Sequence, residues 1–404
     1  MRYRKHGSMD HQQQIEPGAS DKQHVPFRNR ITRITWGWFP CTMSTGAMAS
    51  LLSQQPFTFR GLETIGKVVF VLDIVLFVTF TCMILARFLL KPQAFIKSLH
   101  HPSESFFFGS FWVSVALILY GVAAYGIPGL ANDNVWLIKA VQVLFWMYIA
   151  SATLVAVFQY DIIFHTERLD INEALPAWIL PAYPFLVSGP LAAQVAKTQP
   201  DLSATQIIIA GIAGQGLGWM LSLLMYSVFY ARLIQGEMPP PSTRPGMYVS
   251  VGPAAYTCAG LISLGQQAKS RLPEGFAGIS SLDIGDLWLA LALPAGLFLW
   301  MFAIWFSALT TLSLIQGIKK MEFSLQWWAF VFPNAGLTIA TIQIGNLLDS
   351  DGIKGVAAGL TVILAVLWIL CAVLHIRAVW RYDVLCPGKD QGVDAVNESG
   401  KLIS

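Results

Sequence analysis

The chain alternates between two kinds of long apolar segment. Segments of the first kind are interrupted by proline, glycine, serine and threonine, and they recur at steps of 71, 73, 69 and 80 residues. Their centres are Pro40, Phe111, Pro184, Pro253 and Pro333, so four of the five carry a proline inside an apolar stretch. A membrane helix tolerates such an interruption only where it faces protein or a polar cavity. The repeat therefore predicts five copies of one unit that together line a pathway.

Segments of the second kind are smoother and richer in leucine, valine and isoleucine. They cover approximately residues 65–90, 136–160, 206–233, 285–317 and 355–380. About 20 consecutive apolar residues cross a bilayer as an α-helix. Together the two kinds predict an all-α integral membrane protein with ten transmembrane helices, arranged as five parallel helical hairpins in a ring around a central pore. The interrupted helices would form the inner ring and the smoother helices the outer ring.

Charge predicts the orientation of this arrangement. Of the 26 lysines and arginines, 19 fall on the face that carries both termini, and 7 fall on the other face. The positive-inside rule places the richer face in the cytosol. We therefore expect a cytosolic, disordered N-terminus over residues 1–33, a ten-helix transmembrane transport domain over 34–380 and a cytosolic C-terminal tail over 381–404. Every hairpin then has the same orientation, as in parallel repeats around an axis along the membrane normal.

Composition and motifs exclude several other classes of function. The chain is 55% hydrophobic and 12% charged, whereas soluble proteins carry about 25% charged residues. Patterns typical of hydrolases, zinc proteases, phosphate-binding loops and dinucleotide-binding folds do not occur in the sequence. We expect no enzyme activity, no metal site, no cofactor and no nucleic-acid partner. Without a nucleotide site, transport across the bilayer would be passive or driven by an ion gradient.

The predicted inner ring is polar and nearly uncharged. Hydroxyl donors, the positive ends of five helix dipoles and backbone groups freed at the proline interruptions suit a small anion. The candidate pore-lining residues are Thr42, Ser44, Thr45, Ser188, Thr257, Pro333 and Thr338. Hydroxyls in membrane helices also bond to their own backbone or join neighbouring helices. That alternative stays open for each hydroxyl.

Three charged residues near the apolar segments need an interpretation. Asp73 lies deep in the second apolar segment, and an intramembrane acid is a functional candidate, here for coupling transport to protons. The alternative is a structural acid that is hydrogen-bonded between an outer and an inner helix. Arg87, near the cytosolic end of its helix, is expected to extend its charge into the interface, and Glu104 is expected to lie at a solvated loop end.

Two motifs resemble a known family. The first is Trp327-Trp328-Ala329-Phe330, followed by Phe332-Pro333, and the second is His100-His101-Pro102, followed by Phe107-Phe108 and Trp112. Both resemble segments of the tellurite-resistance/dicarboxylate transporter family, which is also the slow-type anion channel superfamily. With the hairpin repeat, the resemblance extends over about residues 34–380. The overall pattern looks most like the fungal sulphite efflux pumps.

This resemblance implies a fold, a gate and an assembly. The family forms a ring of five helical hairpins around a central pore, commonly as a homotrimer. A phenylalanine of the ninth helix, immediately before the proline, closes the pore, and that role carries over to Phe332. A bulky apolar ring in a narrow pore blocks conduction both sterically and by dewetting. Phe107 and Phe108 are further candidates for packing against the gate.

The sequence and the resemblance together predict a plasma-membrane transporter that exports sulphite or bisulphite. A dicarboxylate carrier would be expected to present a buried arginine or lysine to its substrate, and the interrupted segments carry none beyond their edges. The alternatives are a malate-type dicarboxylate permease and a gated anion channel. A membrane scaffold without transport is disfavoured, because a scaffold has no need of five polar-lined interruptions. The expected partners are therefore a small inorganic anion and the lipid bilayer.

Overall fold

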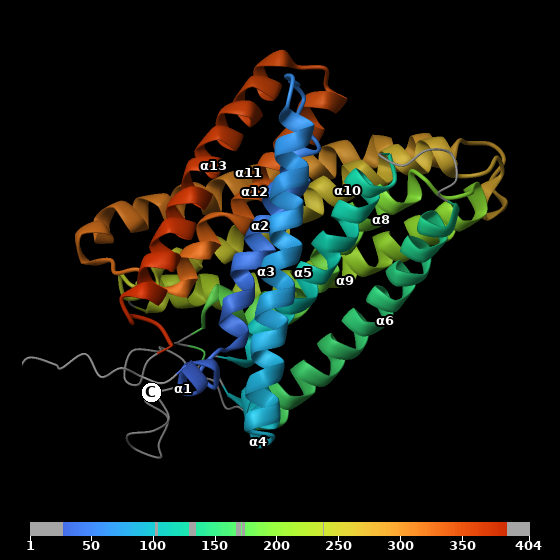
Figure 1. Ribbon diagram of the computed structural model, residues 1–404. Coiled ribbons are helices and arrows are strands. Elements are labelled where there is room, and N and C mark those ends of the chain that lie inside the picture. The colour runs from blue at the N-terminus through green and yellow to red at the C-terminus, as the bar shows by residue number, and fades with distance from the viewer. Residues whose placement is uncertain are drawn as a thin grey trace, which may run out of the picture.

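The computed structural model describes residues 27–101, 104–128, 135–166, 171, 174–236 and 238–385 (Figure 1). Every regular element within these ranges is helical, and they contain no strand, so the all-α prediction is confirmed. The predicted terminal segments 1–33 and 381–404 lie mostly outside the described residues.

Each of five successive units contains a short helix or helix pair followed by a long helix. The short helices are α2 (Phe39–Leu52), α5 (Phe108–Gly121), α7 (Tyr183–Leu186) with α8 (Ser188–Ala196), α10 (Val251–Arg271) and α12 (Phe332–Leu347). The long helices are α3 (Leu62–Leu90), α6 (Val135–Thr166), α9 (Asp201–Gln235), α11 (Ile284–Gly317) and α13 (Asp351–Trp380). Two further helices, α1 (Phe27–Ile31) and α4 (Gln93–His100), lie outside this pattern.

The short helices contact one another in a closed circuit. Helix α2 packs on α5, α5 on α7 and α8, α8 on α10, α10 on α12, and α12 returns to α2. Each also packs on the long helix that follows it in the chain. Figure 1 shows α2 beside α3 in the middle of the molecule, with α6 and α13 toward opposite sides. We call the circuit the inner ring and the five long helices the outer helices.

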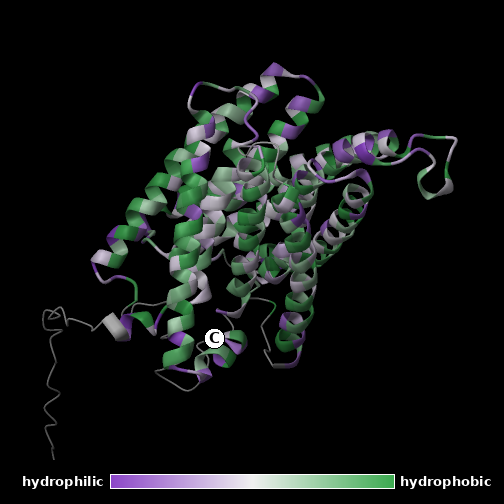
Figure 2. Ribbon diagram, turned by 45° about the vertical axis from the view of Figure 1, so that its right-hand side comes forward, coloured by the Kyte–Doolittle hydropathy of each residue, from purple (hydrophilic) through white to green (hydrophobic). Residues whose placement is uncertain are grey.

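The inner helices are more deeply buried than the outer helices. In the apolar stretches of the outer helices, between 17% and 39% of the residues are buried within the protein. In three inner stretches, Ser105–Gly126, Pro176–Ala196 and Arg244–Arg271, the share is between 61% and 89%. Figure 2 shows that the long helices are mostly hydrophobic along their length. Such broad exposed apolar surfaces are typical of contact with a membrane.

Eight helical stretches in the described part of the chain are long and apolar enough to cross a membrane. The protein is therefore a multi-pass membrane protein, but the predicted number of ten spans is not confirmed. The two missing spans correspond to α2, which has 14 residues, and α12, which has 16. Helix α5 also has 14 residues, but it is continuous with the helical turns on both sides of it, so the stretch Ser105–Gly126 is long enough.

All five breaks have the same form. A 3₁₀ segment precedes each inner helix: Trp36–Trp38, Ser105–Phe107, Pro176–Ala182, Arg244–Ser250 and Leu325–Phe330. The sequence predicted prolines inside interrupted helices, whereas Pro40, Pro184 and Pro333 lie in the first turn of an α-helix. A proline there removes no intrahelical hydrogen bond. The second unit makes the same break at Phe108 without a proline, because Gly109 stands where the third and fifth units have Pro184 and Pro333.

A side chain from another element donates a hydrogen bond to a backbone carbonyl at or beside each break. The pairs are Arg87 to Ile34, Gln159 to Ser105, Tyr148 to Pro184, Tyr226 to Ser250 and Tyr256 to Phe332. A change from 3₁₀ to α winding leaves carbonyls without their usual helical partners. Since lipid offers no replacement donors, these side chains are what makes the breaks tolerable.

The predictions for Arg87 and Glu104 were wrong. Arg87 is 7% exposed and Glu104 is 4% exposed, and the guanidinium binds both carboxylate oxygens, with Nη2 3.1 Å from Oε2. Arg87 Nη1 also donates to the carbonyl of Ile34 at 2.7 Å. Arg87 therefore does not extend toward solvent. The ion pair joins the end of α3 to the start of α5.

We predict that Glu104→Gln destabilises the protein because it leaves the buried Arg87 charge without its partner. Breaking one side of a buried ion pair costs about 3–5 kcal/mol, which thermal unfolding of the purified protein would measure. The matched control is Glu63→Gln, which breaks a 2.7 Å pair with Lys67 on the same helix, where the side chains are 74% and 43% exposed. Exposed pairs contribute about 0–1 kcal/mol. Equal losses for the two variants would contradict this account.

Candidate functional site

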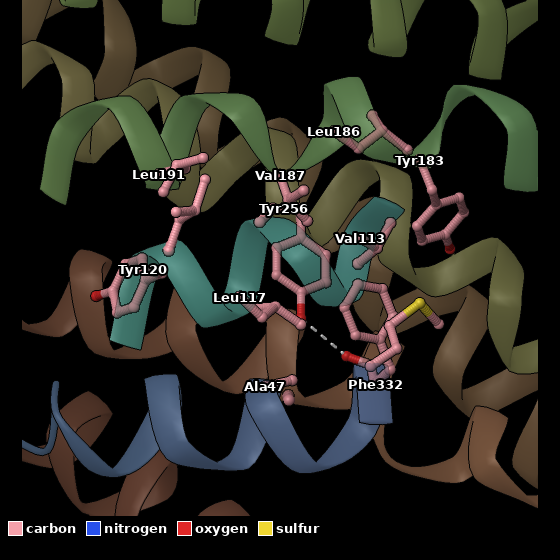
Figure 3. Close-up of a cluster of buried hydrophobic side chains, with 14 of the residues drawn as sticks. Ala47, Val113, Leu117, Tyr120, Tyr183, Leu186, Val187, Leu191, Tyr256 and Phe332 are labelled. Carbon is pink, nitrogen blue, oxygen red and sulfur yellow. Dashed lines mark hydrogen bonds between the residues drawn. The ribbon is translucent and has the colours of Figure 1, made fainter. Parts of the chain in front are cut away.

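Phe332 lies in the middle of the inner ring and is completely buried. Its ring stacks on that of Tyr256, with centroids 4.7 Å apart and planes at 22°. On another side it contacts Tyr183, with centroids 5.7 Å apart. Figure 3 shows these rings within a cluster of apolar side chains that includes Val113, Leu117 and Val187. Four different inner helices and the α7–α8 junction thus meet around this phenylalanine.

The local sequence explains how the three rings approach one another. Phe332 is the first residue of α12, and Tyr183 is the first residue of α7, so each ring projects from a break. Tyr256 lies in the second turn of α10. Its ring fits against α12 because residue 336 is glycine: a Cβ atom on Gly336 would fall 2.6 Å from Cε2 of Tyr256. Only glycine permits so close an approach of ring and backbone.

A small cavity lies next to this cluster and marks the axis of the ring. Its lining comes from all five inner units: Ser50, Ala116, Leu117, Tyr120, Val187, Pro190, Leu191, Tyr256 and Ile339. The volume is ≈ 10 Å³, which is space for about one water molecule. The centre of the ring is therefore closed to any larger solute in this structure.

The predicted pore-lining hydroxyls are all buried, and each has a hydrogen-bond partner in the protein. Several bonds join an inner helix to a neighbour: Thr42 with Ser114 at 2.8 Å, Ser44 to the Trp328 carbonyl at 3.0 Å, Trp368 to Thr45 at 3.1 Å, and Gln215 to Thr257 at 2.9 Å. Ser188 and Thr338 donate to carbonyls of their own chain segment, Phe185 and Asn334. The structure does not gather these hydroxyls around Phe332, and their role as pore-lining groups stays a prediction.

Phe107 and Phe108 do not share the ring contacts of Phe332. The ring of Phe108 lies 4.7 Å from that of Trp36 and 6.5 Å from that of Phe111, so it packs where α2 and α5 begin. Phe107 is half-buried against the hydrophobic core.

Sequence reasoning instead missed Tyr183 and Tyr256. One signal was available, because Phe39-Pro40, Tyr183-Pro184 and Phe332-Pro333 place an aromatic ring before proline in three of the five units.

Asp73 lies directly behind the inner ring. The side chain is completely buried, and neither carboxylate oxygen has a hydrogen-bond partner among the described residues. Its Oδ2 would be 2.7 Å from a Cβ atom on Gly46 of α2, and the same Cβ would be 2.9 Å from Leu117, which lines the cavity. The absence of a side chain at Gly46 thus lets Asp73 and Leu117 both pack directly against the backbone of α2. The hydrogen bonds required by the purely structural alternative are absent from the described residues.

Comparisons with known proteins agree with these features. Residues 33–376 match the family model of SLAC1, described as voltage-dependent anion channel. The malic acid transport protein of Schizosaccharomyces pombe is 34% identical over 372 residues, which cover 91% of this chain and 83% of that protein. The sulfite efflux pump SSU1 of Trichophyton rubrum is 27% identical over 345 residues, which cover 84% of this chain and 89% of the pump.

A more distant relative is an uncharacterized transporter of Methanocaldococcus jannaschii, 23% identical over 360 residues, or 86% of this chain and 95% of that protein. The family and the relatives carry names of transporters or channels and not of enzymes. Among the relatives named, identity is higher with the malic acid transport protein than with the sulfite pump. The chain belongs to the SLAC1, or voltage-dependent anion channel, family, as the motifs around Phe332 predicted.

Proposed function

We propose that this protein carries small anions through the centre of the inner ring, and that Phe332 closes the path. The observation that carries the proposal is the position of Phe332: it is completely buried, contacts rings from two other inner units and adjoins a cavity lined by all five. A packed aromatic side chain on the axis of such a ring obstructs a path along that axis. The proposal includes the arrangement of ten transmembrane helices as five hairpins, with the broken α2 and α12 segments counted as spans.

The charge distribution supports an anion as the solute. Within their bounds, α2, α5, α7, α8 and α12 contain no aspartate, glutamate, lysine or arginine, and α10 has Lys269 and Arg271 only in its last turn. A metal cation would require acidic side chains along the path. The five inner helices begin at breaks inside the protein, where their positive dipole ends favour negative charge.

For the substrate we propose a malate-type dicarboxylate, which reverses the order of the two candidates from the sequence. The support is the 34% identity to the malic acid transport protein over 91% of this chain. Sulphite or bisulphite is the second candidate. It is favoured by the absence of lysine and arginine from the walls around Phe332 and by the 27% identity to a sulfite efflux pump. A plasma-membrane location, cytosolic termini and a homotrimer remain proposals drawn from the sequence.

Transport assays on proteoliposomes test the substrate directly. We predict saturable uptake of radiolabelled malate that exceeds uptake into empty liposomes, and weaker inhibition of that uptake by sulphite than by unlabelled malate. Saturable sulphite flux without malate flux would instead establish the second candidate. Absence of flux for both anions would contradict anion transport by the purified protein.

We predict that Phe332→Ala increases anion flux, because a methyl group cannot fill the space between Tyr183 and Tyr256. The increase would be measured as efflux of preloaded anion in proteoliposomes at equal protein content. Phe108→Ala is the matched control, since it removes a ring of the same size that packs on Trp36 and not on the axis. An unchanged flux in a folded Phe332→Ala protein would exclude this residue as the gate.

We also propose that Asp73 couples anion movement to protons. A buried carboxylate without a donor is costly unless it binds a proton, and Asp73 packs on α2 at Gly46, which also contacts the cavity-lining Leu117. A neutral acid beside the path admits an anion, whereas an ionised one repels it. Binding and release of a proton at Asp73 would thus accompany each anion.

Asp73→Asn should abolish this coupling and leave a pH-independent anion flux. The measurement is the internal pH of proteoliposomes, reported by an entrapped dye while an anion gradient drives transport. The control is Glu63→Gln, a neutralisation on the same helix at a side chain that is 74% exposed. Proton movement that persists in Asp73→Asn, or its absence from the unaltered protein, would refute the coupling role.

A further inference from the structure

Tyr256 is part of the closure and not only a neighbour of it. The ring is 2% exposed, stacks on Phe332 and also lines the axial cavity. In Figure 3 it lies between Phe332 and the side chains of Leu117 and Val187. The axis is therefore filled by two stacked rings that come from different inner helices, α10 and α12.

The hydroxyl of Tyr256 is bonded to the residue that bears the gate. It donates to the carbonyl oxygen of Phe332 at 3.1 Å, the dashed line in Figure 3. This carbonyl belongs to the first residue of α12, where the 3₁₀ segment ends. Tyr256 thus contacts α12 at Phe332 through both ring and hydroxyl, and again one turn later at Gly336.

Tyr183, the other tyrosine that contacts Phe332, has a different hydrogen-bond partner. The hydroxyl of Tyr183 donates to the carbonyl of Val249, at the end of the 3₁₀ segment before α10. A displacement of α12 would leave that bond intact, whereas it would break the bond of Tyr256. Among the hydroxyls around Phe332, the one on Tyr256 is released by movement of the gate segment.

We propose that Tyr256 is a latch and an oxyanion-binding residue: its hydroxyl holds the Phe332 segment in the closed position and donates to the transported anion when that bond is released. The proposal rests on the proposed function and extends it to the residue that recognises the solute. A phenol is a hydrogen-bond donor as well as an acceptor. Hydrogen bonds to ionised oxygens are roughly twice as strong as those between neutral groups, so a carboxylate or sulphite oxygen competes well with a carbonyl.

A released Tyr256 hydroxyl would supply a hydrogen-bond donor to the anion in a part of the pathway that has few others. Apolar side chains line most of the axial cavity, and the other candidate hydroxyls already have partners, either on a neighbouring helix or in their own segment. An anion that enters such a region loses hydration, and the loss is costly unless a donor replaces water. Tyr256 provides that donor beside Phe332, and the same movement that removes the obstruction exposes it.

The test uses Tyr256→Phe, which keeps the stacked ring and removes only the hydroxyl. We expect two changes: the leak, measured as passive efflux of preloaded anion, rises, and the KM for anion transport rises. Each should increase roughly three- to tenfold, as for the loss of one hydrogen bond. The matched control is Tyr226→Phe, which removes a bond of the same kind, to the carbonyl of Ser250 at 2.5 Å. That bond also supports a break but does not lie at Phe332, so Tyr226→Phe should lower thermal stability by a similar amount while leak and KM stay unchanged.

A second variant keeps the hydroxyl. Gly336→Ala places a Cβ atom 2.6 Å from the Tyr256 ring, and it should raise the leak by pushing the ring away from α12. Size-exclusion elution and thermal unfolding would establish that each variant is folded. If neither variant changes leak or KM relative to Tyr226→Phe, the latch is refuted.

The Phe332→Ala background separates this proposal from the proposed function. In that background Tyr256→Phe should add little to the leak, because the gate is already absent, yet it should still raise KM. Additive effects on leak would contradict the latch. If Phe332→Ala itself leaves flux unchanged, the gate proposal fails; if it raises flux but Tyr256→Phe alters neither leak nor KM, only the present inference fails.

Discussion

The whole arrangement depends on satisfying backbone carbonyls at five helix breaks in a region where lipid supplies no donors. In three cases the donor is a tyrosine of the preceding unit: Tyr148 for the third unit, Tyr226 for the fourth and Tyr256 for the fifth. Ser44 of the first unit donates back to Trp328 of the fifth. With the bond between Thr42 of the first unit and Ser114 of the second, these bonds tie the five units into a ring.

This construction explains why the proposed pathway and its proposed closure lie at the same level of the molecule. The breaks place the first residues of α7 and α12 inside the ring, where the aromatic side chains at these positions contact each other. One of the breaks is held by Tyr256, whose ring packs on Phe332 and whose hydroxyl donates to the Phe332 carbonyl. Structural contacts and the proposed gating contacts thus coincide at one tyrosine, while the outer helices present apolar surface to the surroundings.

The sequence was sufficient for the period, the separation of inner from outer helices and the family, and it singled out Phe332, whose role as the gate stays a proposal. It did not reveal Tyr256, the Arg87–Glu104 pair or the partners of the hydroxyls, because these depend on contacts between units. The separations are informative: 76 residues for Tyr256 and Phe332 and 72 for Thr42 and Ser114, close to one repeat. Such contacts join equivalent levels of adjacent copies, a relation that hydropathy patterns within a single copy do not contain. The prolines were predicted inside kinked helices, whereas they lie in the first turns of helices. Apolar composition does not distinguish a kinked helix from a helix that begins after a 3₁₀ turn.

The central claim is that anions pass along the axis lined by all five inner units, and labelling of that axis tests it most directly. The experiment introduces Leu117→Cys into a Phe332→Ala protein whose five natural cysteines have been replaced, and treats proteoliposomes with a negatively charged thiol reagent. Phe59→Cys in the loop between α2 and α3, where the side chain is 61% exposed, is the control. The account predicts that labelling at Leu117→Cys blocks anion flux and that labelling at Phe59→Cys does not. Full flux through protein shown by mass spectrometry to be labelled at Leu117→Cys would contradict it.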